Sequence, residues 1–149
     1  MTKFMNIDEF KSQFIAAMAQ SGLQWVEEEG YEGPGSMLTT EFVMPRYHDG
    51  CSLRMVASED MVTLTFILDR IVPSFDNLKL MNDFNANVDC LNASIIRMGR
   101  EGQPFLVLKA NLFNVESEAG AIAFVGKVLN YVLSDAVAPY LRPLTIITE

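Results

Sequence analysis

The chain has 149 residues, of which half are apolar and a fifth are charged, and its formal net charge is -8. This length suits one domain with a single core, and the composition is that of a folded chain rather than a disordered one. Because the negative field repels phosphate backbones and the cations are spaced singly along the sequence, we expect no nucleic-acid partner.

The N-terminal segment MTKFMNIDEFKSQF has no apolar core of signal-peptide length, and no apolar run approaches the ~18 residues that a membrane span needs. Cys51 and Cys90 lie on different predicted elements and follow no metal or redox spacing. Two reduced, packed thiols are the simpler interpretation, and we therefore expect a cytoplasmic protein. From the missing ligand spacing and the missing apolar run we expect no metal, no cofactor and no membrane partner.

A first helix is predicted to begin at Asn6, whose side chain suits the first turn, and Glu9 is expected to return the bond in a capping box. The apolar residues that follow recur at helical spacing: Ile7, Phe10, Phe14 and Met18. Gly22 is a suitable end, because glycine takes the left-handed conformation at no steric cost. Residues Leu23 to Glu29 then read as a short strand.

Three further strands are predicted from Met37 to Met44, from Cys51 to Ala57, and from Met61 onward, where alternation is clearest. The links between them, PRYHDG and SED, are too short for a parallel crossover, so the strands must be antiparallel neighbours.

The second helix is expected to start at Ser74 and to run to about Asn87. Two strands follow, from Leu91 to Met98 and from Phe105 to Leu112, joined by the turn GREGQP. A last helix is predicted from about Glu116 to Val137, ending at Pro139 because proline cannot continue it. The tail LRPLTIITE is β-prone and suits an edge strand or simple packing.

These elements predict one α+β domain over residues 1–149, with an antiparallel sheet and helices packed on one of its faces. The expected order is α-β-β-β-α-β-β-α.

No residue pattern indicates a reaction. His48, Asp49 and Cys51 match no ligand motif, so a solvated turn is the better interpretation than a metal or nucleophile cluster. The run Glu27–Glu29 does not converge on one cation, because neighbouring strand residues point to opposite faces. Trp25, the single tryptophan, is expected to make a core contact.

The last helix carries more apolar surface than a helix on one sheet needs. On a helical wheel an arc of roughly 220° is covered by Ala121, Ile122, Phe124, Val125, Val128, Leu129, Val132, Leu133 and Ala136. The excess is buried either by the first helix or by a second subunit, and we expect a homodimer because closed two-fold dimers are the commonest assembly.

The second helix places two asparagines, Asn82 and Asn85, inside an apolar face formed by Phe75, Leu78, Met81, Phe84 and Val88. A buried carboxamide without partners costs about 1–3 kcal/mol. Two interpretations remain open: the asparagines bond backbone groups at the helix end and the next strand, or they receive the backbone of a bound peptide.

The segment MNDFNANVDCLNASIIRM, followed by PFLVLKANLF and a long closing helix, resembles the YbjN family of small bacterial proteins. That family has an N-x-[WF]-N element at the end of its central helix, matched here by Asn82, Phe84 and Asn85. The resemblance implies the fold of class I type III secretion chaperones. The aromatic here is phenylalanine rather than tryptophan, and Leu23 to Glu29 adds a strand.

The sequence therefore predicts a non-enzymatic, chaperone-like or regulatory protein that binds an unidentified protein or peptide and pairs with itself. The alternative is a small-molecule-binding module, with a pocket between sheet and helices lined by Phe84 and the asparagines. A hydrolase that uses His48 with Cys51 or Asp49 is a third, weaker hypothesis.

Overall fold

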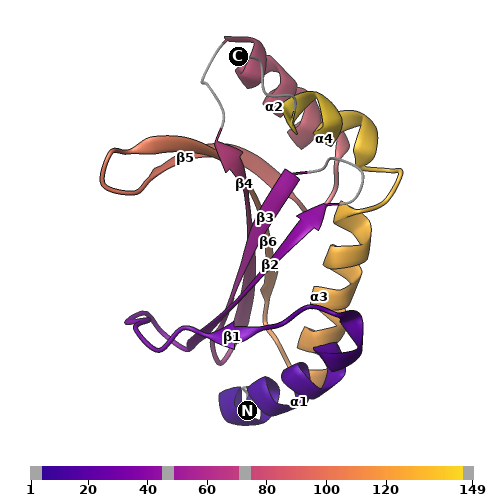
Figure 1. Ribbon diagram of the computed structural model, residues 1–149. Helices are drawn as coiled ribbons and strands as arrows, with labels where there is room; N and C mark the ends of the chain where they lie inside the picture. The colour runs from indigo at the N-terminus through magenta and orange to yellow at the C-terminus, as the bar shows by residue number, and fades with distance from the viewer. Residues whose placement is uncertain (1–4, 45–48, 71–74, 146–149) are drawn as a thin grey trace.

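A six-stranded antiparallel sheet and four α-helices form the fold, which the computed structural model describes for residues 5–44, 49–70 and 75–145 (Figure 1). The elements are, in chain order, α1 (Ile7–Met18), η1 (Ala19–Ser21), β1 (Val26–Glu27), β2 (Ser36–Met44), β3 (Asp49–Ala57), β4 (Met61–Arg70), α2 (Phe75–Asn87), β5 (Asn92–Met98), β6 (Gln103–Phe113), α3 (Glu118–Val132) and α4 (Ala138–Thr145).

The strand order is β1-β2-β3-β4-β6-β5, and every pair is antiparallel. In Figure 1 α3 lies to the right of the sheet, α1 lies below it and α2 and α4 lie at the top, whereas the β5–β6 hairpin and the β1–β2 loop project to the left. The predicted α+β class, with an antiparallel sheet and helices on one face, is confirmed. The short strand predicted from Leu23 to Glu29 is present as the two-residue β1, which adds to the expected order, and the helix α4 is a further, unpredicted element.

The closing segment forms two helices rather than the one that was predicted. Helix α3 ends at Val132, and a turn at residues 134–137 precedes α4. Pro139 does not end a helix but lies in the first turn of α4, where its missing N–H is not needed. Thr145 closes α4, so the start of the β-prone tail is helical, and residues 146–149 lie outside the described residues.

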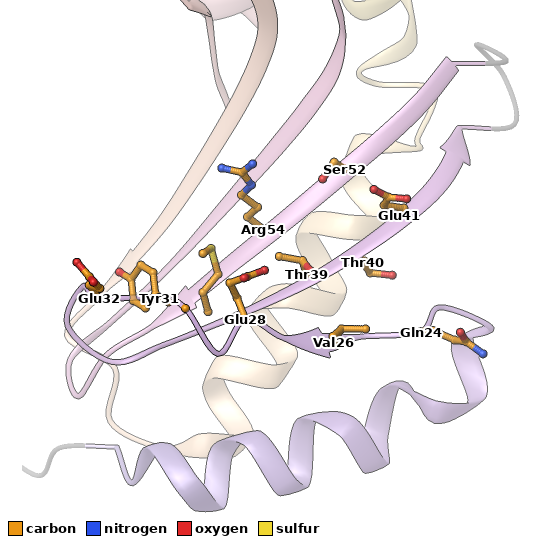
Figure 2. A pocket seen from close by; sticks show the side chains of 12 residues that line it. Gln24, Val26, Glu28, Tyr31, Glu32, Thr39, Thr40, Glu41, Ser52 and Arg54 are labelled. Carbon is orange, nitrogen blue, oxygen red and sulfur yellow. The ribbon is translucent and has the colours of Figure 1, made fainter. Parts of the chain in front are cut away.

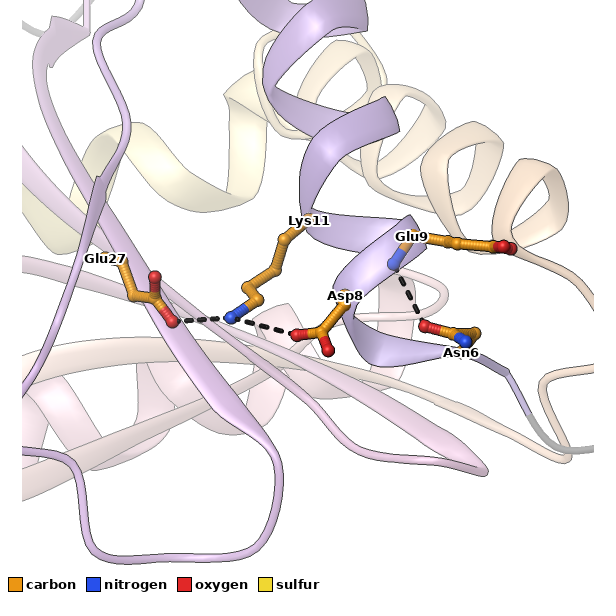
Figure 3. Close-up of polar contacts among 5 residues, drawn as sticks. All are labelled: Asn6, Asp8, Glu9, Lys11 and Glu27. Atoms are coloured by element: carbon orange, nitrogen blue, oxygen red, sulfur yellow. Dashed lines mark hydrogen bonds and ion pairs between the residues drawn. The ribbon is translucent and has the colours of Figure 1, made fainter.

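Helix α1 begins as the sequence predicts, but its capping box is only half formed. Asn6 Oδ1 accepts a hydrogen bond from the Glu9 N–H at 3.0 Å, which satisfies an open donor of the first turn (Figure 3). The Asn6 N–H donates to Glu118 Oε1 at 2.9 Å and not to Glu9. The expected return bond is therefore wrong, and the side chain that replaces it ties α1 to α3. Gly22 takes the predicted left-handed conformation, with φ 79°.

One charged contact links α1 to the edge of the sheet. Lys11 Nζ lies 2.8 Å from Glu27 Oε1 and 3.6 Å from Asp8 Oδ1 (Figure 3). The hydrogen bond to Glu27 raises the pKa of Lys11 above its ordinary value. The two carboxylates of this contact are exposed to solvent, and the contact orients β1 more than it stabilises the fold.

The core lies between the helices and one face of the sheet, where side chains alternate inward as the strand period requires. Its largest fully buried members from the strands are Leu38, Leu53, Met55, Leu64, Phe66, Leu106 and Leu108. Aromatic rings extend it below β1: Phe10 stacks on Phe14 at 5.5 Å, and Trp25 meets Phe14 edge-on at 4.9 Å. Trp25 therefore makes the core contact that the sequence predicts.

Part of the wide apolar arc of α3 is covered within the chain. Its centre is buried where α1 and the sheet pack on it: Ala121, Val125, Val128 and Val132. Its flanks are only half-buried, at Ile122, Phe124, Leu129 and Leu133, and Ala136 is exposed. Intramolecular packing thus accounts for the centre of the arc and leaves its flanks partly open to solvent.

Both cysteines are thiols, but only one is packed. Cys51 is buried in β3, whereas Cys90 is exposed in the loop after α2, with φ 67°. The prediction that both are packed is wrong for Cys90, because the loop turns it outward. His48 lies outside the described residues. No described helix has the length and apolar character to cross a membrane.

Candidate functional site

The sheet face turned away from the helices, which we call the open face, is bordered by three adjoining hollows. Strand pairing sets its central row: Thr39 lies opposite Arg54, Arg54 opposite Thr65, and Thr65 opposite Lys109. These side chains point away from the core because they alternate with the buried residues along each strand. No helix covers this face in the described part of the chain (Figure 1).

The first hollow has a volume of about 850 Å³ and lies beside β1, the β1–β2 loop, β2 and β3. Figure 2 shows three carboxylate side chains around it, those of Glu28, Glu32 and Glu41, with Arg54 on the opposite side. Tyr31 closes the loop end. This hollow is therefore acidic along one border and cationic at the centre of the sheet.

The second hollow, of about 480 Å³, is mainly apolar and lies at the other end of β2 and β3. Its apolar lining comes from both sides of the sheet: Val43, Ile67 and Phe105 lie on the open face, whereas Phe42, Cys51 and Leu68 belong to or pack against the core. The third hollow, of about 420 Å³, is formed by Arg54, Phe105 and the β5–β6 turn.

The three hollows form one continuous surface because they share lining residues. Glu41 and Ser52 line both the first and the second hollow, and Phe105 lines both the second and the third. Arg54 lines the first and the third. A single extended ligand can therefore contact acidic, apolar and cationic groups in succession.

Sequence reasoning missed this surface. Cations spaced singly along the chain meet on the open face, since Arg54 and Lys109 lie in one row and Arg100 lines a hollow with Arg54. The signal was available in strand parity: Arg54 and Lys109 both alternate with buried residues. Strand order, however, is needed to bring β3 and β6 together across β4.

The three residues of the predicted site lie elsewhere, on α2. Phe84 is fully buried, but Asn82 and Asn85 are exposed. The prediction that both asparagines lie on a buried face is wrong, because the buried stripe of α2 is narrow and runs through Met81, Phe84 and Val88. Even Leu78, placed on that face by the wheel, is 53% exposed.

Asn85 holds the backbone of the next strand with both ends of its carboxamide. Its Oδ1 accepts from the Ala93 N–H at 2.7 Å, and its Nδ2 donates to the Ala93 carbonyl at 3.1 Å. Of the two interpretations that the sequence left open, the geometry of Asn85 matches the first, in which the carboxamide bonds backbone groups of the same chain and not those of a bound peptide. Asn87 ends α2 and donates from Nδ2 to the Asp83 carbonyl at 2.8 Å, while Asn92 opens β5.

The predicted small-molecule pocket between sheet and helices is not supported. Phe84 fills its place as a fully buried core residue. None of these three hollows is lined by Phe84, Asn82 or Asn85.

Comparison with known proteins places the fold. No family model matches the sequence, and no curated protein matches it. Among solved structures, YbjN from E. coli, described as a candidate transcription regulator, superposes with a TM-score of 0.57. The alignment covers 93% of this chain and 89% of YbjN at 16% sequence identity. The chain has a YbjN-like fold.

At 16% identity the likeness to YbjN shows the fold alone. It therefore confirms the fold that the sequence resemblance implied. The N-x-F-N element lies at the end of α2, where the resemblance placed it. In this YbjN-like chain its phenylalanine belongs to the core, and its second asparagine joins α2 to β5.

We expect Asn85→Leu to lower the free energy of unfolding by about 1–3 kcal/mol, because it removes both partners of the Ala93 backbone. Asn82→Leu is the matched control, since it is the same substitution at an exposed position of the same helix. Its effect should stay within about 0.5 kcal/mol. Urea denaturation of the two variants measures the difference, and equal stability would remove the structural role of Asn85.

Proposed function

We propose that this chain is a non-enzymatic, chaperone-like or regulatory protein that binds a polypeptide partner and acts as a homodimer. The observation that supports it is the continuous open face, which offers apolar and charged groups along an extended path. The likeness to YbjN, described as a candidate regulator and not as an enzyme, agrees with a binding role.

The chemistry of the open face defines the partner. The apolar second hollow suits aliphatic or aromatic side chains, and burying each one contributes about 1.5–3 kcal/mol. The three carboxylates around the first hollow suit a basic side chain, in line with the chain's charge of -8. The proposed partner is therefore a polypeptide segment with apolar residues next to lysine or arginine.

Site-specific photo-crosslinking in native cells tests this proposal. We expect a crosslinker placed at Thr39 or at Ser52, both on the open face, to capture the same polypeptide. A crosslinker at Lys127, exposed on α3, is the control and should not capture it. Glu41→Lys should reduce capture at Ser52, because it reverses one charge that both hollows share.

Two results would contradict the proposal. Equal capture at Lys127 and Thr39 would show that the open face does not select the partner. A monomeric mass of 16.7 kDa in light scattering, in place of twice that value, would remove the homodimer.

A further inference from the structure

Strand β5 forms one edge of the sheet, and it is the edge with the fewest features that prevent pairing. Native edges are usually protected by short strands, charges or proline. The opposite edge follows this rule: β1 has two residues, and the uncovered part of β2 beside it carries Glu41. By contrast, β5 has seven residues, NASIIRM, with no proline and no carboxylate.

The hydrogen bonds of Asn85 show which backbone groups of β5 point outward. Since Asn85 binds both the N–H and the C=O of Ala93, these groups face away from β6. Strand geometry repeats every second residue, so the N–H and C=O of Ile95 and Arg97 also face outward. Pro104 lies opposite Arg97. Proline has no N–H, so it fits here because Arg97 and Pro104 form a pair that exchanges no hydrogen bonds.

Asn85 thus acts as a one-residue strand partner at Ala93, and the pairing stops there. Among the residues that the structure describes, no backbone group pairs with the outward groups of Ile95 or Arg97. Arg97 does not project across the edge, because its Nη1 donates to the Gly102 carbonyl of its own hairpin at 3.0 Å. An extended strand is the ligand that satisfies such groups.

We propose that β5 pairs antiparallel with β5 of a second copy of this chain, about a two-fold axis at Ile96. This proposal rests on the homodimer that the proposed function includes, and it identifies β5 as the interface between the two subunits. Ile95 then lies opposite the partner subunit's Arg97, and Arg97 opposite the partner subunit's Ile95. The two sheets join into one, and the two open faces become continuous.

The structure selects this register over its neighbours. An axis at Ile95 would pair Arg97 with Ala93 of the partner subunit, whose groups Asn85 already holds. An axis at Arg97 would bring two like charges directly opposite each other, which is unfavourable. An axis at Ile96 keeps the Asn85 bonds and uses both outward positions of each copy.

Side chains and charge agree with this pairing. Ile96 is half-buried on the open face beside Phe105, and at the axis it meets the partner subunit's Ile96 at the close spacing of a non-hydrogen-bonded pair. Two chains of charge -8 repel each other, but β5 contributes no carboxylate to the seam. The interface is therefore apolar at its axis and self-complementary in its hydrogen bonds.

Substitution of Ile96 by charged residues, which would face each other across the two-fold axis, tests the proposal. Ile96→Asp and Ile96→Lys each place like charges opposite each other, and each should weaken the dimer roughly 100-fold in light scattering over a dilution series. Mixed together, the two variants should form a heterodimer within about tenfold of the wild-type affinity. Circular dichroism confirms that each variant is folded before it is scored.

A disulfide provides a second measurement that does not weaken the interface. In a Cys90→Asn background, which removes the exposed thiol, Ile96→Cys should form a covalent dimer on mild oxidation. Met98→Cys, on the same face, is the control, because the two copies of residue 98 would be ~13 Å apart along the strands. It should remain uncrosslinked.

The outcomes separate this inference from the homodimer itself. A wild-type dimer that survives Ile96→Asp, with no disulfide at position 96, would overturn the β5 interface and leave the homodimer standing. A wild-type monomer would overturn both. A crosslink at 98 equal to that at 96 would contradict the proposed register.

Discussion

Phe84→Ala is expected to lower the free energy of unfolding by about 3–5 kcal/mol, the usual cost of removing a buried aromatic ring. Phe84 is fully buried near the end of α2, in the stripe that packs this helix on the core. Truncation removes its contacts and leaves a cavity that the surrounding helices and strands can fill only in part. Because total stability is typically 5–15 kcal/mol, the variant should melt at a much lower temperature.

Phe113→Ala is the matched control for this substitution. Phe113 is 65% exposed at the end of β6, so the same change should cost less than about 1 kcal/mol. Both variants should be denatured in urea at one protein concentration, since the stability of a dimer depends on concentration. If Phe84→Ala were no more harmful than Phe113→Ala, the aromatic residue of the N-x-F-N element would not be a core residue.

Gly35→Ala is expected to destabilise the protein by roughly 2–4 kcal/mol through backbone geometry alone. Gly35 has φ +79°, and a Cβ there would lie 1.9 Å from the carbonyl oxygen of Ala57 at the end of β3. The contact is with backbone and not with the end of a flexible side chain, so the start of β2 must move. The left-handed conformation adds its own cost of about 1–2 kcal/mol for any residue other than glycine.

Gly22→Ala separates these two costs. Gly22 has the same φ of +79°, but a Cβ there meets nothing within 4 Å. It should therefore lose only the conformational part, about 1–2 kcal/mol. Thermal melting of both variants gives the comparison, and an equal loss would mean that β2 and β3 separate easily at this end.

The elements most accurately predicted from sequence are those with strong local signals. Asn6 and Gly22 mark the limits of the first helical segment through capping and left-handed geometry, which depend on neighbouring residues alone. Strand alternation from Met61 fixes β4 and its buried face for the same reason. The YbjN-like fold was predicted from the resemblance of the segment with Asn82, Phe84 and Asn85, and the order of the elements agrees with it.

The errors arose where a distant segment decides the outcome. Glu118, and not Glu9, receives the Asn6 N–H, because α3 packs beside the start of α1. Pro139 starts a helix in place of ending one, because the chain turns after α3. Asn82 and Asn85 are exposed, because the contact of α2 with the core is narrower than its apolar wheel.

The sequence by itself determined the α+β class, the antiparallel pairing and the limits of most elements, because caps, turns and alternation act over a few residues. Tertiary structure alone decided the open face and the β5 edge. Lys109 joins the row of Arg54 and Thr65 only when β6 pairs with β4, and the outward groups of β5 are identified only by the Asn85 bonds. Both features depend on strand order, which places residues far apart in the chain side by side and leaves no local signal.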